Sequence, residues 1–182
     1  MPPNPKKSNV RPVLVPQNGR PRPLSDEQAA AWLNSLSQQM PAAALQQGRQ
    51  VLEQNPASLR FRGAYYQLLC DQEMKTELID LTKAYLKKQP RDSLALTYLT
   101  HGLRLCGRIP EAISYLEKLY KLNPGDPVTL NSLGSAYKAM GDFELAEEFL
   151  SRAIAIKPDY GVAYWNKSDI SHTPGEDLAH IQ

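Results

Sequence analysis

The sequence has few of the residues that build metal sites and disulfide frameworks. Its 182 residues include two cysteines, Cys70 and Cys106, which lie far apart in the sequence and have no C-x-x-C spacing. This pattern indicates reduced thiols rather than a disulfide framework or a zinc site. The three histidines, His101, His172 and His180, have no cluster of cysteines or carboxylates at ligand spacing. We therefore expect no bound metal ion.

Long apolar runs and catalytic signatures are missing as well. No stretch approaches the ~18 to 20 apolar residues of a membrane-spanning helix, and "VRPVLVP" is too short for the core of a signal peptide. We therefore expect a cytoplasmic protein that makes no use of a membrane. The motifs G-x-S-x-G, G-x-x-x-x-G-K-[ST] and G-x-G-x-x-G do not occur. Because these motifs mark nucleophiles and phosphate-binding loops, we expect neither catalysis nor a cofactor in this chain.

Residues 1–24 lack acidic side chains and differ from the rest in composition. They carry seven of the fifteen prolines and five basic residues. Such a segment buries too little apolar surface to offset its ordering entropy, so residues 1–24 are predicted to form a disordered basic arm. The formal net charge of +2 then leaves −3 for residues 25–182. We expect no nucleic-acid binding, since only the arm has a basic character.

What the rest of the sequence does contain is proline at a fixed interval. Pro56, Pro90, Pro124 and Pro158 are evenly spaced along the chain. Their period is within the range that indicates stacked structural repeats. Each interval holds two helical apolar patterns with a break between them. Each repeat is therefore predicted to be a helix hairpin.

Residues 127–160 show the pattern most clearly. Asp126 is a good N-cap for the first helix, which is predicted to end at Gly141. The first helix carries L-x-x-L-G-x-x-Y and the second A-x-x-x-L-x-x-A-I, and each motif places its apolar residues on one helical face. Gly134 and Ala146 are small where the two helices must approach. The sequence therefore predicts an antiparallel hairpin with a narrow waist.

These motifs resemble the tetratricopeptide repeat, in which they are joined by a turn glycine and an aromatic residue and followed by proline. Residues 93–126 keep the same pattern, with Thr100 in place of the small glycine. Residues 59–92 depart further from it, because Glu73 occupies the place of the turn glycine. The resemblance covers about three quarters of the chain.

Residues 25–58 match least well, because Trp32 stands where Gly134 does in the clearest repeat. We include them because Ser25 and Gln28 can form a capping box, which predicts the start of a helix. The resemblance implies an all-α fold, a right-handed helical-hairpin solenoid of about four tetratricopeptide repeats. The repeats are expected at about residues 25–58, 59–92, 93–126 and 127–160.

Residues 161–182 follow the last repeat and are predicted to begin with a capping helix. A further helix is expected to start at the N-cap Thr173, with Glu176 three residues later, and it stops at Gln182 as if the chain were truncated. Residues 163–182 also resemble the connector of bacterial proteins that join tetratricopeptide repeats to a sulfotransferase domain. That resemblance implies a non-catalytic front part of such an enzyme, since the R-S-G-[ST]-T donor loop is missing here.

The first helices also predict a binding surface. Helical geometry places a second set of positions on the side opposite the core, and in tetratricopeptide repeats this side lines a groove. The resemblance therefore implies that the groove holds a protein or peptide segment. A merely solvated face is the alternative. The predicted groove residues are Arg60, Gln67, Thr97, His101, Arg104, Asn131, Ser135 and Lys138.

The charge of this face favours a partner with acidic residues. Arg60, Arg104 and Lys138 lie on three successive first helices, and Asp71 is the nearest acidic residue of the predicted face. Arg104 is the strongest candidate, because its planar guanidinium can pair with a carboxylate through two hydrogen bonds. In the alternative interpretation, Arg104 only neutralises an acidic residue of a neighbouring repeat, such as Asp71. A Lys and Asn clamp that some family members use for C-terminal carboxylates does not match these positions.

Three functions remain open at this point. The first is a non-catalytic module that binds a partner segment in the groove. The second is the front region of a sulfotransferase whose catalytic domain lies beyond residue 182. The third is an isolated assembly factor or chaperone adaptor, which needs no further domain.

Overall fold

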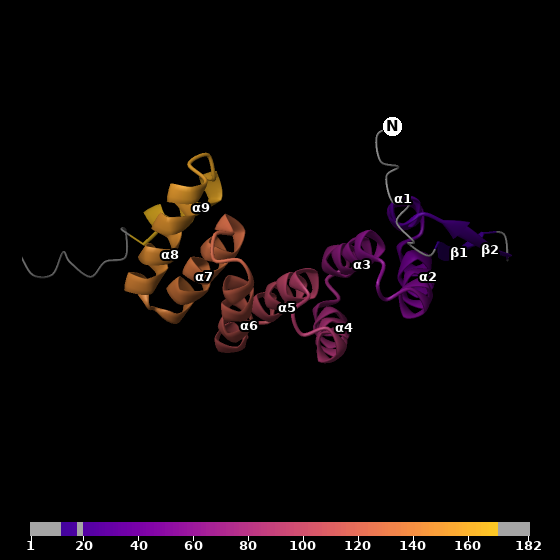
Figure 1. The fold of residues 1–182 in the computed structure, drawn as a ribbon, viewed down its shortest axis with the longest axis horizontal. Helices are drawn as coiled ribbons and strands as arrows, with labels where there is room; N and C mark the ends of the chain where they lie inside the picture. Colours follow the sequence, from indigo (N-terminus) through magenta and orange to yellow (C-terminus); the bar gives the residue numbers. More distant parts are fainter. Residues whose placement is uncertain (1–11, 18–19, 171–182) are drawn as a thin grey trace, which may run out of the picture. The chain divides into compact units, whose positions relative to one another are not determined.

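A computed structural model describes residues 12–17 and 20–170 (Figure 1). The chain divides into two compact units, a first unit of Met1–Met74 and a second unit of Lys75–Gln182. The first unit contains β1 (Val13–Gln17), β2 (Arg20–Leu24), α1 (Asp26–Gln39), α2 (Pro41–Gln54) and α3 (Leu59–Asp71). The second contains α4 (Lys75–Lys88), α5 (Ser93–Leu105), α6 (Ile109–Leu122), α7 (Pro127–Met140), α8 (Phe143–Ile156) and α9 (Gly161–Ser168).

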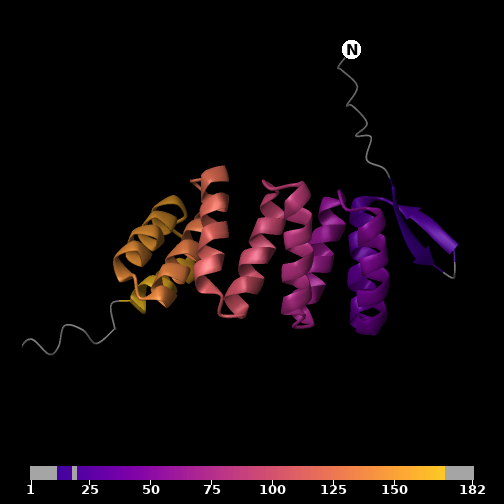
Figure 2. The ribbon, with the colours of Figure 1, turned by 90° about the horizontal axis from the view of Figure 1, so that it is seen from below.

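The helices follow the predicted period. Helices α1 to α8 form four consecutive pairs along the chain, and each pair falls within one of the predicted repeats. In the second unit, neighbouring helices run side by side in alternating directions (Figure 2). Helix α9 follows the last pair and packs on α7 and α8, as a capping helix would. The predicted class of consecutive helical hairpins is therefore confirmed, with the addition of strands β1 and β2. The division between the units falls inside the predicted repeat 59–92, at the turn between α3 and α4.

The prediction of a disordered arm is wrong for residues 13–17 and 20–24, which form two strands. Strands β1 and β2 pair antiparallel, with Val13 opposite Leu24 and Val15 opposite Arg22. Val13, Val15 and Leu24 are buried, and β1 packs on both α1 and α2. Alternating residues of a strand share one face, so Val13 and Val15 can both enter the core of the first unit. The prolines of this segment are tolerated because a two-stranded sheet has only edge strands. Residues 1–11 lie outside the described part.

Polar side chains fix the starts of several helices. The predicted capping box is present, since Ser25 Oγ accepts from Gln28 N at 3.2 Å and Ser25 N donates to Gln28 Oε1 at 3.0 Å. Asp92, Asp126 and Asp142 accept in the same way from backbone N–H groups in the first turns of α5, α7 and α8. These bonds satisfy donors that the helix itself leaves without a partner.

Helix α3 is capped by a residue of another helix. Asp26 of α1 accepts hydrogen bonds from the backbone N–H groups of Arg60 and Phe61, each at 2.9 Å, and from the Ser58 hydroxyl. Burial raises the pKa of the Asp26 carboxyl, but these hydrogen bonds outweigh burial and hold its pKa below the usual value. One carboxylate thereby joins α1 to the start of α3.

Two glycines allow helices to approach closely. A methyl group on Gly134 would lie 2.6 Å from Leu150 Cγ and 3.0 Å from the carbonyl oxygen of Ala146, which confirms the predicted waist between α7 and α8. In the first unit, the close approach is made by Gly48, where a methyl group would lie 2.7 Å from Tyr65 and 2.9 Å from Leu33. This close approach at Gly48 was not predicted from the sequence.

The turn inside each of three helix pairs uses the left-handed backbone region. Gly107 and Gly141 have φ angles of 70° and 82°. Glu73, at the equivalent position one repeat before Gly107, has a φ of 55°. The backbone of Glu73 therefore adopts a conformation that is unfavourable for residues other than glycine.

The close approach of α7 and α8 at Gly134 predicts that adding one methyl group there is destabilising. Gly134→Ala should lower the free energy of unfolding by ~1 to 3 kcal/mol through overpacking, because the backbone oxygen of Ala146 cannot move aside cheaply. Gly161→Ala is the control, since a methyl group there would contact nothing within 4 Å. Urea unfolding followed by circular dichroism measures both changes. A Gly134→Ala variant as stable as the parent would contradict the close approach.

The strained turn predicts a stabilising substitution. Glu73→Gly should raise the free energy of unfolding by up to ~1 kcal/mol, because relief of the left-handed strain exceeds the entropy that glycine loses on folding. Glu144→Gly, in the first turn of α8, should lower it by ~1 kcal/mol, because glycine is a poor helix former. Thermal and urea denaturation of the two variants test this contrast in sign, and destabilisation by Glu73→Gly would refute the strained geometry.

Candidate partner-binding groove

The second unit has a cavity of about 450 Å³ between α5 and α7. Helix α5 contributes three lining residues, the first turn of α6 one and α7 three. Four of them belong to the predicted groove, so the structure brings these four together. The lining residues are His101, Arg104, Leu105, Ile109, Ser135, Lys138 and Ala139.

Helical periodicity explains why these residues face the cavity. Leu96, Leu99 and Leu103 of α5 are fully buried on the core side. His101 and Arg104 lie between or beside these leucines in sequence, so a rotation of 100° per residue carries them to another side of the helix. Because α7 repeats α5 one period later, it presents Ser135 and Lys138 from the same places. The cavity is therefore lined by equivalent faces of two repeats.

Arg104 is a half-buried cation with a neutral partner. Its Nη2 atom donates a hydrogen bond to Ser135 Oγ at 3.2 Å. Within residues 12–17 and 20–170, no carboxylate forms an ion pair with it. Burial lowers the pKa of the Arg104 guanidinium from its usual value, yet arginine stays protonated in proteins. The cavity wall therefore carries a positive charge that no described side chain neutralises.

Lys138 differs from Arg104 because it has a charged partner. Its Nζ atom lies 2.9 Å from Asp169 Oδ2, at the end of α9. The side chain of Lys138 is mostly buried, with 22% exposed, whereas that of Asp169 is 64% exposed. The positive charge of Lys138 is thus compensated within the chain.

His101 lines the same cavity as Arg104. Burial and the charge of Arg104 lower the pKa of the His101 imidazole below its ordinary value of 6.5. At neutral pH, the imidazole is therefore uncharged and can both donate and accept a hydrogen bond. It adds polar contacts to the cavity without adding charge.

The other predicted groove residues lie elsewhere. Asn131 is buried and accepts a hydrogen bond from Asn166 Nδ2 at 2.9 Å, so it joins α7 to α9. Thr97 is exposed and donates to the backbone oxygen of Ser93 at 2.8 Å. In the first unit, Arg60 lies 3.6 Å from Glu27, and Gln67 donates to Asp71 at 2.8 Å.

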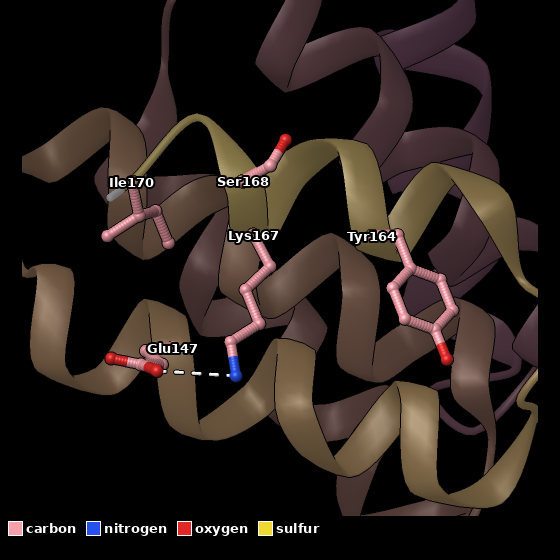
Figure 3. Close-up of a pocket in the computed structure, with 5 residues that line it drawn as sticks. All are labelled: Glu147, Tyr164, Lys167, Ser168 and Ile170. Carbon is pink, nitrogen blue, oxygen red and sulfur yellow. Dashed lines mark ion pairs between the residues drawn. The ribbon is translucent and has the colours of Figure 1, made fainter. Parts of the chain in front are cut away.

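A second cavity, of about 290 Å³, lies between α8 and α9 (Figure 3). Lys167 points across it toward α8, where its Nζ atom lies 3.3 Å from Glu147 Oε1 and 2.9 Å from Ser151 Oγ. Tyr164, Ser168 and Ile170 complete the lining. Lys167, the cation in the lining of this cavity, is paired with Glu147, so an incoming anion would be attracted less strongly here than in the groove. The bonds of Lys167 instead hold α9 on α8.

Sequence reasoning missed two residues that shape the groove. Ile109 lines the cavity from the start of α6, a helix whose residues were not considered for the groove. Asp169 compensates Lys138 although it lies beyond the last predicted repeat. The period contained a signal for Asp169, because it follows Ser135 by one full repeat.

In the part of the chain that the structure describes, no group of three His, Cys, Asp or Glu residues could hold a metal ion. Nor does any described helix reach the length and apolar character needed to cross a membrane.

The comparisons with known proteins agree with this architecture. The tetratricopeptide repeat family model matches residues 106–167. A TPR repeat-containing protein of Pseudomonas aeruginosa is 30% identical over 140 residues, which are 75% of this chain and 23% of that protein. The chain thus spans less than a quarter of the relative that it matches.

Two solved structures share the fold. The structure of the MamA protein is 18% identical and has a TM-score of 0.67, with 80% of each chain covered. That of TTC0263, a thermophilic TPR protein of Thermus thermophilus, is 16% identical and has a TM-score of 0.63, again with 80% of each chain covered. Residues 106–167 are thus tetratricopeptide repeats by sequence, and the fold is that of such proteins. The resemblance of residues 163–182 to a sulfotransferase connector stays a prediction.

The surroundings of His101 in the groove predict a lowered imidazole pKa. Folding lowers the pKa of the His101 imidazole, so as the pH falls the unfolded chain binds a proton at His101 before the folded chain does. The free energy of unfolding should therefore decrease as the pH falls below ~6.5. NMR titration of the imidazole signals, with His101→Gln to assign the resonance, should give a pKa below 6.5. Arg104→Gln should raise this pKa by removing a nearby positive charge. An unchanged pKa in Arg104→Gln would show that the two side chains do not interact.

Proposed function

We propose that the second unit is a non-catalytic protein-interaction module that holds a partner segment in the groove between α5 and α7. The segment carries an acidic side chain next to an apolar one. The observation that supports this proposal is the half-buried Arg104, whose hydrogen-bond partner is the neutral Ser135. Because a charge taken out of water is costly unless it is paired, a carboxylate from outside the chain would be stabilised there.

The chemistry of arginine favours a carboxylate over other groups. The planar guanidinium has five N–H donors and can form two parallel hydrogen bonds with one carboxylate. Arg104 uses Nη2 on Ser135, and among the described residues its side chain has no other hydrogen-bond partner. The neutral imidazole of His101 can add a further polar contact without repelling an anion. The resulting preference is for Asp or Glu.

The apolar lining favours a peptide over a free anion. Leu105 lines the cavity although 47% of its surface is exposed, and Ile109 and Ala139 lie beside it. Covering these side chains would remove apolar area from water, which contributes roughly 25 cal/mol per Å². A cavity of about 450 Å³ falls within the ordinary range for ligand sites. A segment with neighbouring acidic and apolar side chains would use both parts of the lining.

The fold and the cysteines support the remaining parts of the proposal. Stacked helix hairpins present extended surfaces that suit protein partners. TTC0263, a TPR protein, shares that fold. The two cysteines of the described residues, Cys70 and Cys106, are both free thiols. Free thiols suit the reducing cytoplasm, where we place this module.

A peptide titration tests the proposed function. The probe is a terminally blocked peptide with one Glu beside one Leu in a Gly-Ser background, added to the ¹⁵N-labelled chain at low salt. Backbone amides of residues 101–105 and 135–139 should shift in a saturable manner. Arg104→Ala should weaken binding by about tenfold or more, since hydrogen bonds to charged groups contribute ~1.5 to 3 kcal/mol.

Two controls separate the groove from general electrostatics. Arg91→Ala removes the same charge from an exposed residue outside the cavity, and it should leave the affinity within about twofold. A second control is a peptide with Gln in place of Glu, which has no carboxylate for Arg104 to bind. The parent and Arg104→Ala should bind this peptide with equal affinity. Equal losses in Arg91→Ala and Arg104→Ala would overturn the proposal, as would amide shifts confined to other surfaces.

A further inference from the structure

Two hydrogen bonds at equivalent places of the repeat differ in whether the acceptor is charged. Arg104 of α5 donates to Ser135 of α7, and Lys138 of α7 donates to Asp169 after α9. Each bond joins a basic residue to the residue 31 positions later. Arg104 and Lys138 are one repeat period apart, as are Ser135 and Asp169. The same place in the repeat therefore holds a hydroxyl in one case and a carboxylate in the other.

Asp169 is held at Lys138 by the way that α9 is anchored. On one side, Asn166 Nδ2 donates to Asn131 Oδ1 of α7 at 2.9 Å. On the other side, Lys167 binds Glu147 and Ser151 of α8, and Figure 3 shows Lys167 reaching across to Glu147. Ala163 is fully buried in the core between them. Helix α9 thus takes the place of a following first helix, and the chain delivers Asp169 to Lys138.

We infer that Asp169 is a built-in substitute for a partner's carboxylate. It closes the carboxylate site at Lys138, whereas Ser135 leaves the equivalent site at Arg104 open. This inference rests on the proposed function, and it makes the groove selective for a segment with a single carboxylate at that place. A second carboxylate directed at Lys138 meets the negative charge of Asp169 and gains nothing.

Ser135 also has the chemistry of an open site. A serine hydroxyl accepts one hydrogen bond here, from Arg104, and keeps its own proton to donate. A carboxylate that enters beside it can therefore accept from both Ser135 Oγ and the Arg104 guanidinium. At Lys138, the carboxylate of Asp169 has no proton to offer and repels an incoming anion. Residues 135 and 169 thus determine where the groove accepts a negative charge.

The first test closes the open site from within. Ser135→Asp places a carboxylate where Asp169 stands in the next repeat, so it should pair with Arg104. Binding of the one-Glu peptide should then fall about tenfold, to the level of Arg104→Ala. Ser135→Asn is the matched control, with nearly the same size and no charge, and it should keep the affinity within about threefold. Circular dichroism verifies that both variants are folded.

The second test opens the closed site. The probes are blocked peptides that carry two Glu residues separated by one, two or three others. With the parent chain, the second Glu should add no affinity. Asp169→Asn removes the internal carboxylate, and at least one of these peptides should then bind about threefold more tightly, because Lys138 becomes available to pair with the second Glu. Adding Lys138→Gln to Asp169→Asn should remove that gain.

The outcomes distinguish this inference from the proposed function. If the parent binds the one-Glu peptide and Ser135→Asp binds it equally well, the inference is wrong and the proposed function stands. The inference is also wrong if Asp169→Asn gains nothing from a second Glu. If no peptide shifts the groove amides of the parent or of Asp169→Asn, the proposed function fails and the inference fails with it.

Discussion

The close approach of paired helices is the constraint on which the rest of the second unit depends. At Gly134, a methyl group would lie 2.6 Å from the Leu150 side chain, so α7 and α8 meet with no space for one. This contact fixes the rotation of α7 about its axis, because Leu130 and Leu133 must then face the core. Once those residues are buried, the opposite side of α7 lines the groove. Packing thereby determines which side chains of α7 line the cavity.

In the proposed function, the specificity of the groove comes from a difference in charge between equivalent places of the repeat. Arg104 and Lys138 occupy the same position in successive first helices, yet among the described residues only Lys138 meets a carboxylate. The difference follows from Ser135 and Asp169, which stand at the same place in successive repeats. A repeat array can therefore vary its ligand preference by changing one residue per repeat, with no change in the packing that supports it.

The period made most of the helical fold predictable. Asp126 and the Ser25–Gln28 pair marked helix starts correctly, because capping depends only on residues close in sequence. The strands at residues 13–17 and 20–24 were missed because proline-rich composition outweighed the alternation of Val13 and Val15. The contribution of Asp26 to the cap of α3 could not be foreseen, since it acts on a helix that is distant in the sequence.

The candidate site was predictable only in part, for a similar reason. Helical periodicity placed His101, Arg104, Ser135 and Lys138 on one face, and the structure gathers them around one cavity. It could not show which of the cations is already neutralised, because that depends on where α9 docks. Asn131 was assigned to the groove because periodicity does not show where α9 docks. In the structure, its side-chain oxygen accepts a hydrogen bond from Asn166 of α9.

The central claim is that Arg104 holds a charge reserved for a carboxylate from outside the chain. The most direct measurement follows the side-chain Nε–Hε signal of Arg104 by NMR as the one-Glu peptide is added. The account predicts a saturable shift of this signal that is larger than that of any exposed arginine and is lost with the Gln peptide. Equal shifts of all arginine signals, or no shift of Arg104, would contradict it.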